Sequence, residues 1–160
     1  MRRNRQAGFS LAEMLIVIAF IGIAIAIGIP LVNEQVRIAE VRSSADDLAL
    51  HLRAARMLAV AKHKTIVFTV NADPANTFSY KALDDSSIFT GTNPKVRGPF
   101  KMPTRVRIAT GSDGTINFLQ NGAVDFVSSV VLESQVSNKL ERWTATVNTV
   151  GLTTLLHERI

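Results

Sequence analysis

The feature that most constrains this chain is an uninterrupted apolar run near its start. Residues 14–32 read MLIVIAFIGIAIAIGIPLV, 19 residues without a charged or strongly polar side chain. As an α-helix, a run of this length spans roughly 28 Å, close to the ~30 Å hydrocarbon core of a bilayer. The sequence therefore predicts a membrane-spanning helix.

The charges that flank the run predict its orientation. Arg2, Arg3 and Arg5 precede it, and Glu34 follows it. The positive-inside rule then places the N-terminus in the cytoplasm and the residues after Val32 outside. A secretory signal peptide is the simpler alternative, but its apolar region is typically ~7–15 residues and ends at a small-residue cleavage site, which is not found here. A plain single-span anchor is a further alternative that length alone does not reject.

An acid stands at the start of the run, in the segment GFSLAE (residues 8–13). A charged residue at the centre of a membrane helix costs about 2.5–3.5 kcal/mol, so Glu13 invites a functional interpretation. The alternative is a capping box, in which the Ser10 hydroxyl and the Glu13 carboxylate each accept the other residue's backbone N–H, with Phe9 and Met14 as a hydrophobic staple. The residues alone leave both interpretations open.

The sequence RRNRQAGFSLAEMLIVIAFIGIAIAIGIP resembles the class III leader of type IV prepilins and type II secretion pseudopilins. The resemblance implies that a prepilin peptidase cleaves after Gly8 and methylates the new N-terminal amine of Phe9. It also implies that Glu13 pairs with the Phe9 amine of a neighbouring subunit during assembly. The chain would then comprise a leader (1–8), a transmembrane and assembly helix (9–32), an amphipathic helix (33–63) and an extracytoplasmic β-rich domain (64–160).

Two residues are expected to weaken the helix within the apolar run. Pro30 lacks an N–H and clashes with the carbonyl of Ala26, and Gly22 has low helix propensity. We therefore expect a kink between them, or local melting once the helix packs in a filament.

Two periodicities follow the run and predict an α+β fold. Apolar residues at helical spacing predict a face that packs on a sheet: Val41, Ala45, Leu48, Leu52, Ala55 and Ala59. From Thr65 the period is two, which is typical of half-buried antiparallel strands. We expect strands near 65–70, 78–82, 105–109, 115–119, 123–126, 130–133, 142–147 and 152–156. Hairpin turns are expected at 111–114 and 121–122, and a long surface loop over 83–103.

The segments TIVFTV, INFLQNG, SVVLES and RWTATVNTVG, in that order, are similar to the GspH/FimT group of minor pilins and pseudopilins, which includes FimU. This resemblance implies a pilin fold and a non-enzymatic subunit that primes or caps a type IV pilus or a type II secretion filament. The implied partners are prepilin peptidase, the inner membrane, and other minor or major pilins or pseudopilins. The domain would lie in the periplasm before it enters the filament.

Binding of DNA is the alternative function, because FimT-type members of the group bind DNA during uptake. From Arg53 to Arg107 the chain carries ten cations and three anions, and such a basic segment could contact phosphates. The candidate contacts are Arg97, Lys101, Arg105 and Arg107. We favour a solvated edge strand instead. DNA binders of the FimT type resemble one another in an arginine-rich motif after a late glycine, whereas Gly151 is followed here by LTT.

The sequence predicts no catalytic residue, no metal site and no cofactor. The chain has no cysteine, which excludes disulfides and thiolate chemistry. His51, His63 and His157 belong to no metal or triad motif. Asp84 and Asp85 lack the further spaced oxygen ligands that calcium requires.

Overall fold

A computed structural model describes residues 10–89, 95–112, 114–136 and 139–160. Within them a long helix, α1 (Leu11–Lys62), precedes all the strands. The chain divides into two compact units, one ending at Val36 and the other formed by Arg37–Ile160. The strands, all in the second unit, are β1 (Ile66–Asn71), β2 (Thr77–Ala82), β3 (Val96–Lys101), β4 (Arg107–Ile108), β5 (Gly114–Phe118), β6 (Ser128–Val136), β7 (Lys139–Val147) and β8 (Thr153–Arg159).

The first unit contains the apolar part of α1. This part is long and apolar enough to cross a membrane, with a mean hydropathy of 3.0 over its most apolar window, and none of that window is buried. A signal sequence near an N-terminus has the same properties, so length and composition alone do not separate the two. The helix continues without interruption through Gly22 and Pro30. Local melting is therefore not seen in the single chain and stays a prediction for the packed state.

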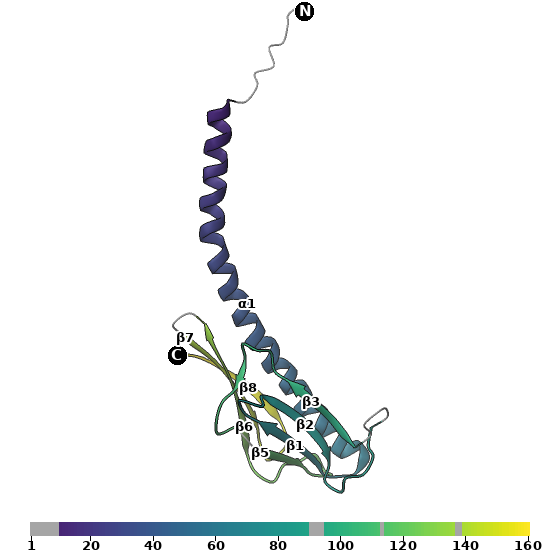
Figure 1. Cartoon of the computed structure of the whole chain (residues 1–160). Helices are drawn as coiled ribbons and strands as arrows, with labels where there is room; N and C mark the ends of the chain where they lie inside the picture. The colour runs from purple at the N-terminus through teal and green to yellow at the C-terminus, as the bar shows by residue number, and fades with distance from the viewer. Residues whose placement is uncertain (1–9, 90–94, 113, 137–138) are drawn as a thin grey trace, which may run out of the picture. The chain divides into compact units, whose positions relative to one another are not determined.

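The second unit contains two antiparallel sheets of four strands each, with strand orders β3-β2-β1-β5 and β4-β6-β7-β8 (Figure 1). β1 lies centrally in the first sheet, where Phe68 pairs with Tyr80 of β2 and with Ile116 of β5. In the second sheet the long β6–β7 pair runs in unbroken register from Ser128 opposite Val147 to Val136 opposite Lys139.

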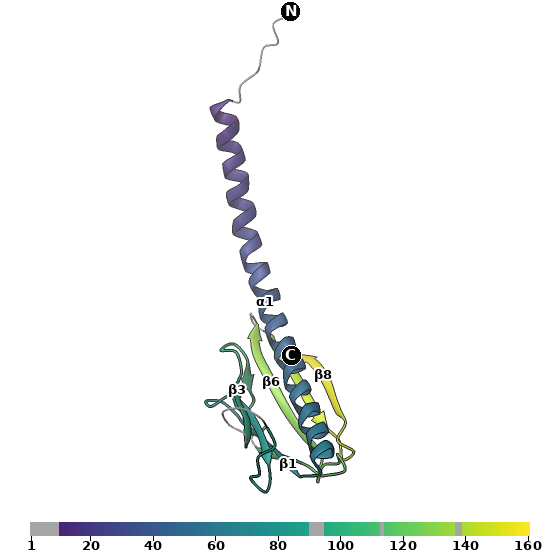
Figure 2. The same cartoon turned by 90° about the vertical axis from the view of Figure 1, so that its right-hand side faces the viewer.

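The domain half of α1 packs its apolar face into the core that both sheets share (Figure 2). The six residues predicted for this face are at most 1% exposed: Val41, Ala45, Leu48, Leu52, Ala55 and Ala59. Phe68 and Phe78 of the first sheet and Leu132 of the second belong to the same cluster. The helical periodicity therefore identified the core face correctly, and the predicted α+β fold class is confirmed.

Three local predictions from the sequence were wrong. The segment 83–103, expected as a loop, contains β3, where Gly98 and Pro99 break the periodic pattern and hid an edge strand. Residues 123–126 form no strand, and Val124 makes only an isolated bridge to Phe118. The turn at 111–114 joins β4 and β5, which lie in different sheets, so it is not a hairpin.

The turn at Asn121-Gly122 forms as expected, and Gly151 packs closely against it. The Gly122 N–H donates to the Leu119 carbonyl, and Gly122 has φ +80°. Gly151, with φ +79°, lies so close that a Cβ on it would clash with the Gly122 carbonyl oxygen. That oxygen also accepts the Arg56 Nε–H of α1 at 3.0 Å. Both glycines are thus required by positive φ, and Gly151 also by close packing.

Candidate assembly segment and basic surface

The described part of the assembly segment begins at Ser10, directly before α1. The Ser10 carbonyl accepts the N–H groups of Glu13 at 3.0 Å and Met14 at 3.2 Å. Neither side-chain bond of the predicted capping box is present between Ser10 and Glu13, both of which the structure describes. The carboxylate of Glu13 is exposed and therefore available to another group. Gly8 and Phe9 lie outside the described residues.

The helix around Glu13 presents apolar side chains in every direction. Leu11, Phe20 and Ile27 are each more than half exposed, as are most large side chains up to Ile29. Contiguous apolar surface of this size marks a site that is covered by lipid or by other proteins. Glu13 is the single charged side chain between Ser10 and Asn33. In an apolar surrounding it gains from pairing with a cation, because an unpaired charge there is strongly penalised.

Gly22, one of the two predicted helix-weakening residues, has no packing constraint among the described residues. A Cβ at Gly22 would meet nothing within 4 Å. The absence of a side chain at residue 22 is thus not required by contacts among the described residues. A functional reason, such as flexibility of the packed helix, stays a prediction.

The structure separates the four predicted nucleic-acid contacts into two groups. Arg97 and Lys101 are exposed on β3, an edge strand of the first sheet. Arg107 is the first residue of β4 in the second sheet, and Arg105 lies in the turn before it. Both line a cavity of about 300 Å³ together with Arg37, Thr104 and Ser134. We call this cavity the arginine pocket. The sequence missed Arg37, because it precedes its partners by almost seventy positions in the chain.

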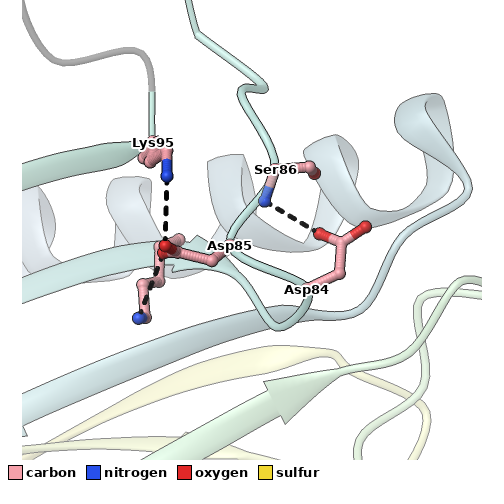
Figure 3. A network of polar contacts seen from close by, with 5 residues as sticks. Asp84, Asp85, Ser86 and Lys95 are labelled. Carbon is pink, nitrogen blue, oxygen red and sulfur yellow. Dashed lines mark hydrogen bonds and ion pairs between the residues drawn. The ribbon is translucent and has the colours of Figure 1, made fainter.

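Part of the basic segment is neutralised by the two aspartates after β2. Lys64 Nζ lies 2.9 Å from Asp84 Oδ2, and Lys81 and Lys95 lie 3.4 and 3.3 Å from the Asp85 carboxylate. The Ser86 N–H also donates to Asp84 at 3.1 Å (Figure 3). Hydrogen bonds from Ser86 and then Lys64 lower the pKa of Asp84 to about 2. Asp84 and Asp85 therefore serve as ion-pair partners for three lysines of the chain.

His51 of α1 packs against aromatic side chains. Its ring lies 4.1 Å from that of Phe100, and its Nδ1 lies 3.3 Å from the Tyr80 hydroxyl. Burial lowers the pKa of His51; the Asp47 carboxylate opposes the shift and Arg97 adds to it. The ring is therefore neutral at pH 7 and packs as part of an aromatic cluster.

A buried acid in β7 was missed by the sequence analysis. Glu141 is 1% exposed, and its carboxylate lies 2.7 Å from His157 Nε2 and 2.8 Å from Arg159 Nε, both on β8. The His157 ring stacks on Trp143 at 4.6 Å. The alternation that predicted Trp143, Ala145 and Val147 as inward-facing also includes residue 141, so the signal was present in the sequence. This cluster ties β7 to the C-terminal edge strand.

Comparisons with known proteins bear on the N-terminal segment and on the fold. A family pattern described as the prokaryotic N-terminal methylation motif matches residues 3–29. No curated protein matches the chain significantly by sequence. The fold is similar to that of the type IV minor pilin FimU of Pseudomonas aeruginosa, with TM-score 0.55, 16% identity, and coverage of 74% of this chain and 89% of FimU.

The minor pseudopilin EpsH of the type II secretion system of Vibrio cholerae is also similar, with TM-score 0.53, 15% identity, and coverage of 74% of this chain and 97% of EpsH. At these identities the similarity shows a shared fold. The chain therefore carries a prokaryotic N-terminal methylation motif and has a pilin-like α+β fold. Both findings support the resemblance to type IV minor pilins and type II secretion pseudopilins.

Proposed function

We propose that the chain is a minor pilin or pseudopilin, a structural and non-enzymatic subunit that primes or caps a type IV pilus or type II secretion filament. One observation carries this proposal: the methylation motif at 3–29 coincides with an exposed apolar helix whose single acid, Glu13, stands near its start. A helix of this kind acts by packing with similar helices. The pilin-like domain that follows supports the same role.

Maturation would begin at the inner membrane. The three arginines of the leader keep residues 1–8 in the cytoplasm, where a prepilin peptidase cleaves between Gly8 and Phe9 and methylates the Phe9 amine. The apolar helix then holds the subunit in the inner membrane with Arg37–Ile160 in the periplasm. Cleavage removes three positive charges next to the membrane and leaves the Phe9 amine as the cation nearest to the apolar helix.

Glu13 would guide entry into the filament. The carboxylate of an incoming subunit pairs with the Phe9 amine of a neighbour, because each charge is penalised when it is unpaired in an apolar medium. The open carboxylate at the start of α1 supports this role, since no capping box engages it. The partners would be other minor or major pilins or pseudopilins.

Incorporation into sheared filaments tests the role of Glu13. We expect Glu13→Ala to be processed and inserted normally but to enter filaments roughly tenfold less, because a charged pair in a low-dielectric medium contributes more than 1 kcal/mol. The matched control is Glu34→Ala, which removes the next acid along the helix, beyond the apolar run. Equal amounts of both variants in the filament fraction would contradict the assembly role.

The alternative, DNA binding during uptake, has less support. Lys64, Lys81 and Lys95 are paired with aspartates. The four candidate contacts are divided between β3 of the first sheet and the segment that leads into β4 of the second. A DNA-binding domain predicts a mobility shift that weakens steeply with salt.

A further inference from the structure

The arginine pocket gathers three guanidinium groups from segments that are distant in the chain. Arg37 lies on α1, Arg105 lies in the turn before β4, and Arg107 begins β4. Two hydroxyl residues, Thr104 and Ser134, complete the lining. Ser134 is only 2% exposed. The cavity has a volume of about 300 Å³ and is open to solvent, so a small polar group fits inside.

These cations are poorly neutralised by the protein. Glu133, the cross-strand partner of Arg107, is already bound by Arg142, with Nη2 and Nε at 2.8 and 3.0 Å from Oε1. Arg105 lies 3.4 Å from Glu40, but its side chain is 54% exposed, and such a pair is weak. Within the described ranges, neither Arg37 nor Arg107 forms an ion pair with an acid. Of the three guanidinium groups, only that of Arg105 forms an ion pair with an acid among the described residues.

This set of donors matches an anion with several oxygen atoms. Guanidinium groups donate paired N–H bonds in a planar fork that fits phosphate, and the hydroxyls supply further donors. A single carboxylate offers two oxygens and would leave much of the pocket without a partner. The chemistry favours a phosphate group.

The position of Arg37 in the chain indicates where that phosphate would come from. Arg37 follows Val32, the last residue of the apolar run, by five residues. Five residues of helix rise about 7.5 Å, and the polar headgroup layer on each side of a ~30 Å hydrocarbon core is about 5–8 Å thick. We propose that the arginine pocket binds the phosphate of a phospholipid headgroup at the periplasmic surface of the membrane. This inference rests on the membrane anchoring proposed above.

Lipid titration of the purified full-length chain tests the proposal. Short-chain phosphatidylglycerol is added to the protein in a neutral detergent, and bound lipid is counted by native mass spectrometry. The pocket variant is Arg37→Gln/Arg107→Gln. The matched control is Arg53→Gln/Lys101→Gln, which removes two exposed charges that line a different cavity, next to Asp46 and Asp47. Parallel titrations use inorganic phosphate and a short DNA duplex.

We expect the pocket variant to bind phosphatidylglycerol at least about tenfold more weakly, since each hydrogen bond to a charged group is worth about that factor. The control should stay within about twofold, because exposed cations contribute little to a specific site. Equal losses in both variants, or no loss in the pocket variant, would overturn the proposal. Dependence of phosphate or DNA binding on Arg37 and Arg107, without the same dependence for lipid, would overturn the lipid as the source.

The assay uses unprocessed protein and reads binding alone. If filament incorporation of the wild type fails while lipid binding depends on the pocket, the assembly role is wrong and the pocket stands. If incorporation succeeds while the pocket variant binds lipid normally, the pocket proposal alone is wrong.

Discussion

At the scale of single residues, two glutamates, Glu13 and Glu141, lie in contrasting environments. Glu13 lies exposed in an apolar segment and forms no ion pair within the described ranges, whereas Glu141 is buried with His157 and Arg159 beside it. The first arrangement leaves a charge for another molecule, and the second stabilises the fold. We propose that the same residue type serves assembly at Glu13, and we expect it to stabilise the fold at Glu141.

Glu141→Gln tests the structural role. Removing one partner of a fully buried ion pair typically costs 3–5 kcal/mol, but His157 and Arg159 are each 42% exposed, so we expect about 1–2 kcal/mol of destabilisation. The control, Glu158→Gln, removes an exposed acid from the neighbouring position and should cost less than about 0.5 kcal/mol. Denaturant unfolding of the two variants measures the difference. Equal stability would show that the cluster does not hold β8 to β7.

Asp84 gives a prediction for pH dependence. Its folded pKa of about 2 is below its ordinary value of 3.8, so its contribution to stability is complete above pH 3.8 and is lost as the pH falls towards 2. Ser86→Ala removes the largest cause of the shift and should raise the titration midpoint towards 3.8. The control is Ser87→Ala. Side-chain NMR of the Asp84 carboxyl gives both midpoints, and an unchanged midpoint in Ser86→Ala would contradict the assignment.

At the scale of elements, α1 shows how much of the fold the sequence predicts. Helical spacing identified six of the seven buried apolar residues of the domain half, all but Ala49, because burial on one side of a helix imposes a period of 3.6. The sequence pattern also located β1, β2, β4, β5, β6, β7 and β8, at least in part. It missed β3, because Gly98 and Pro99 interrupt the pattern, and it did not show which strands share a sheet. Those pairings depend on contacts between distant segments.

Leu50 and Leu52 provide a direct test of this helix face. Leu52 is fully buried, and Leu50, two positions earlier, is 60% exposed. Leu52→Ala leaves a cavity in the shared core and should cost about 2–5 kcal/mol of unfolding free energy. Leu50→Ala should change it by less than about 0.5 kcal/mol. Thermal or denaturant unfolding distinguishes them, and similar losses would mean that the buried face is misassigned.

The candidate sites show the same limit. Glu13 and the Gly8–Phe9 junction are local patterns, so sequence alone pointed to them. The arginine pocket joins Arg37 with Arg105 and Arg107, and only the folded domain brings these residues together. A count of charges along the chain gave a basic middle segment, but it could not show that aspartates neutralise Lys64, Lys81 and Lys95.

At the scale of the whole molecule, the composition separates into parts with different roles. The chain carries a net charge of +5, and three of these charges lie in residues 1–8. The apolar run at residues 14–32 lies in α1, and Arg37–Ile160 form a domain with its own core. We propose that residues 1–8 are removed so that the apolar helix can join those of other subunits.

The mature N-terminus tests this claim most directly. The protein is isolated from cells that have an active prepilin peptidase, and its intact mass and N-terminal peptide are measured, with Gly8→Ala as the control. The account predicts a chain that begins at N-methylated Phe9, and a Gly8→Ala chain that keeps its leader. A wild-type chain that retains Met1, or one cleaved after the apolar run, would contradict it.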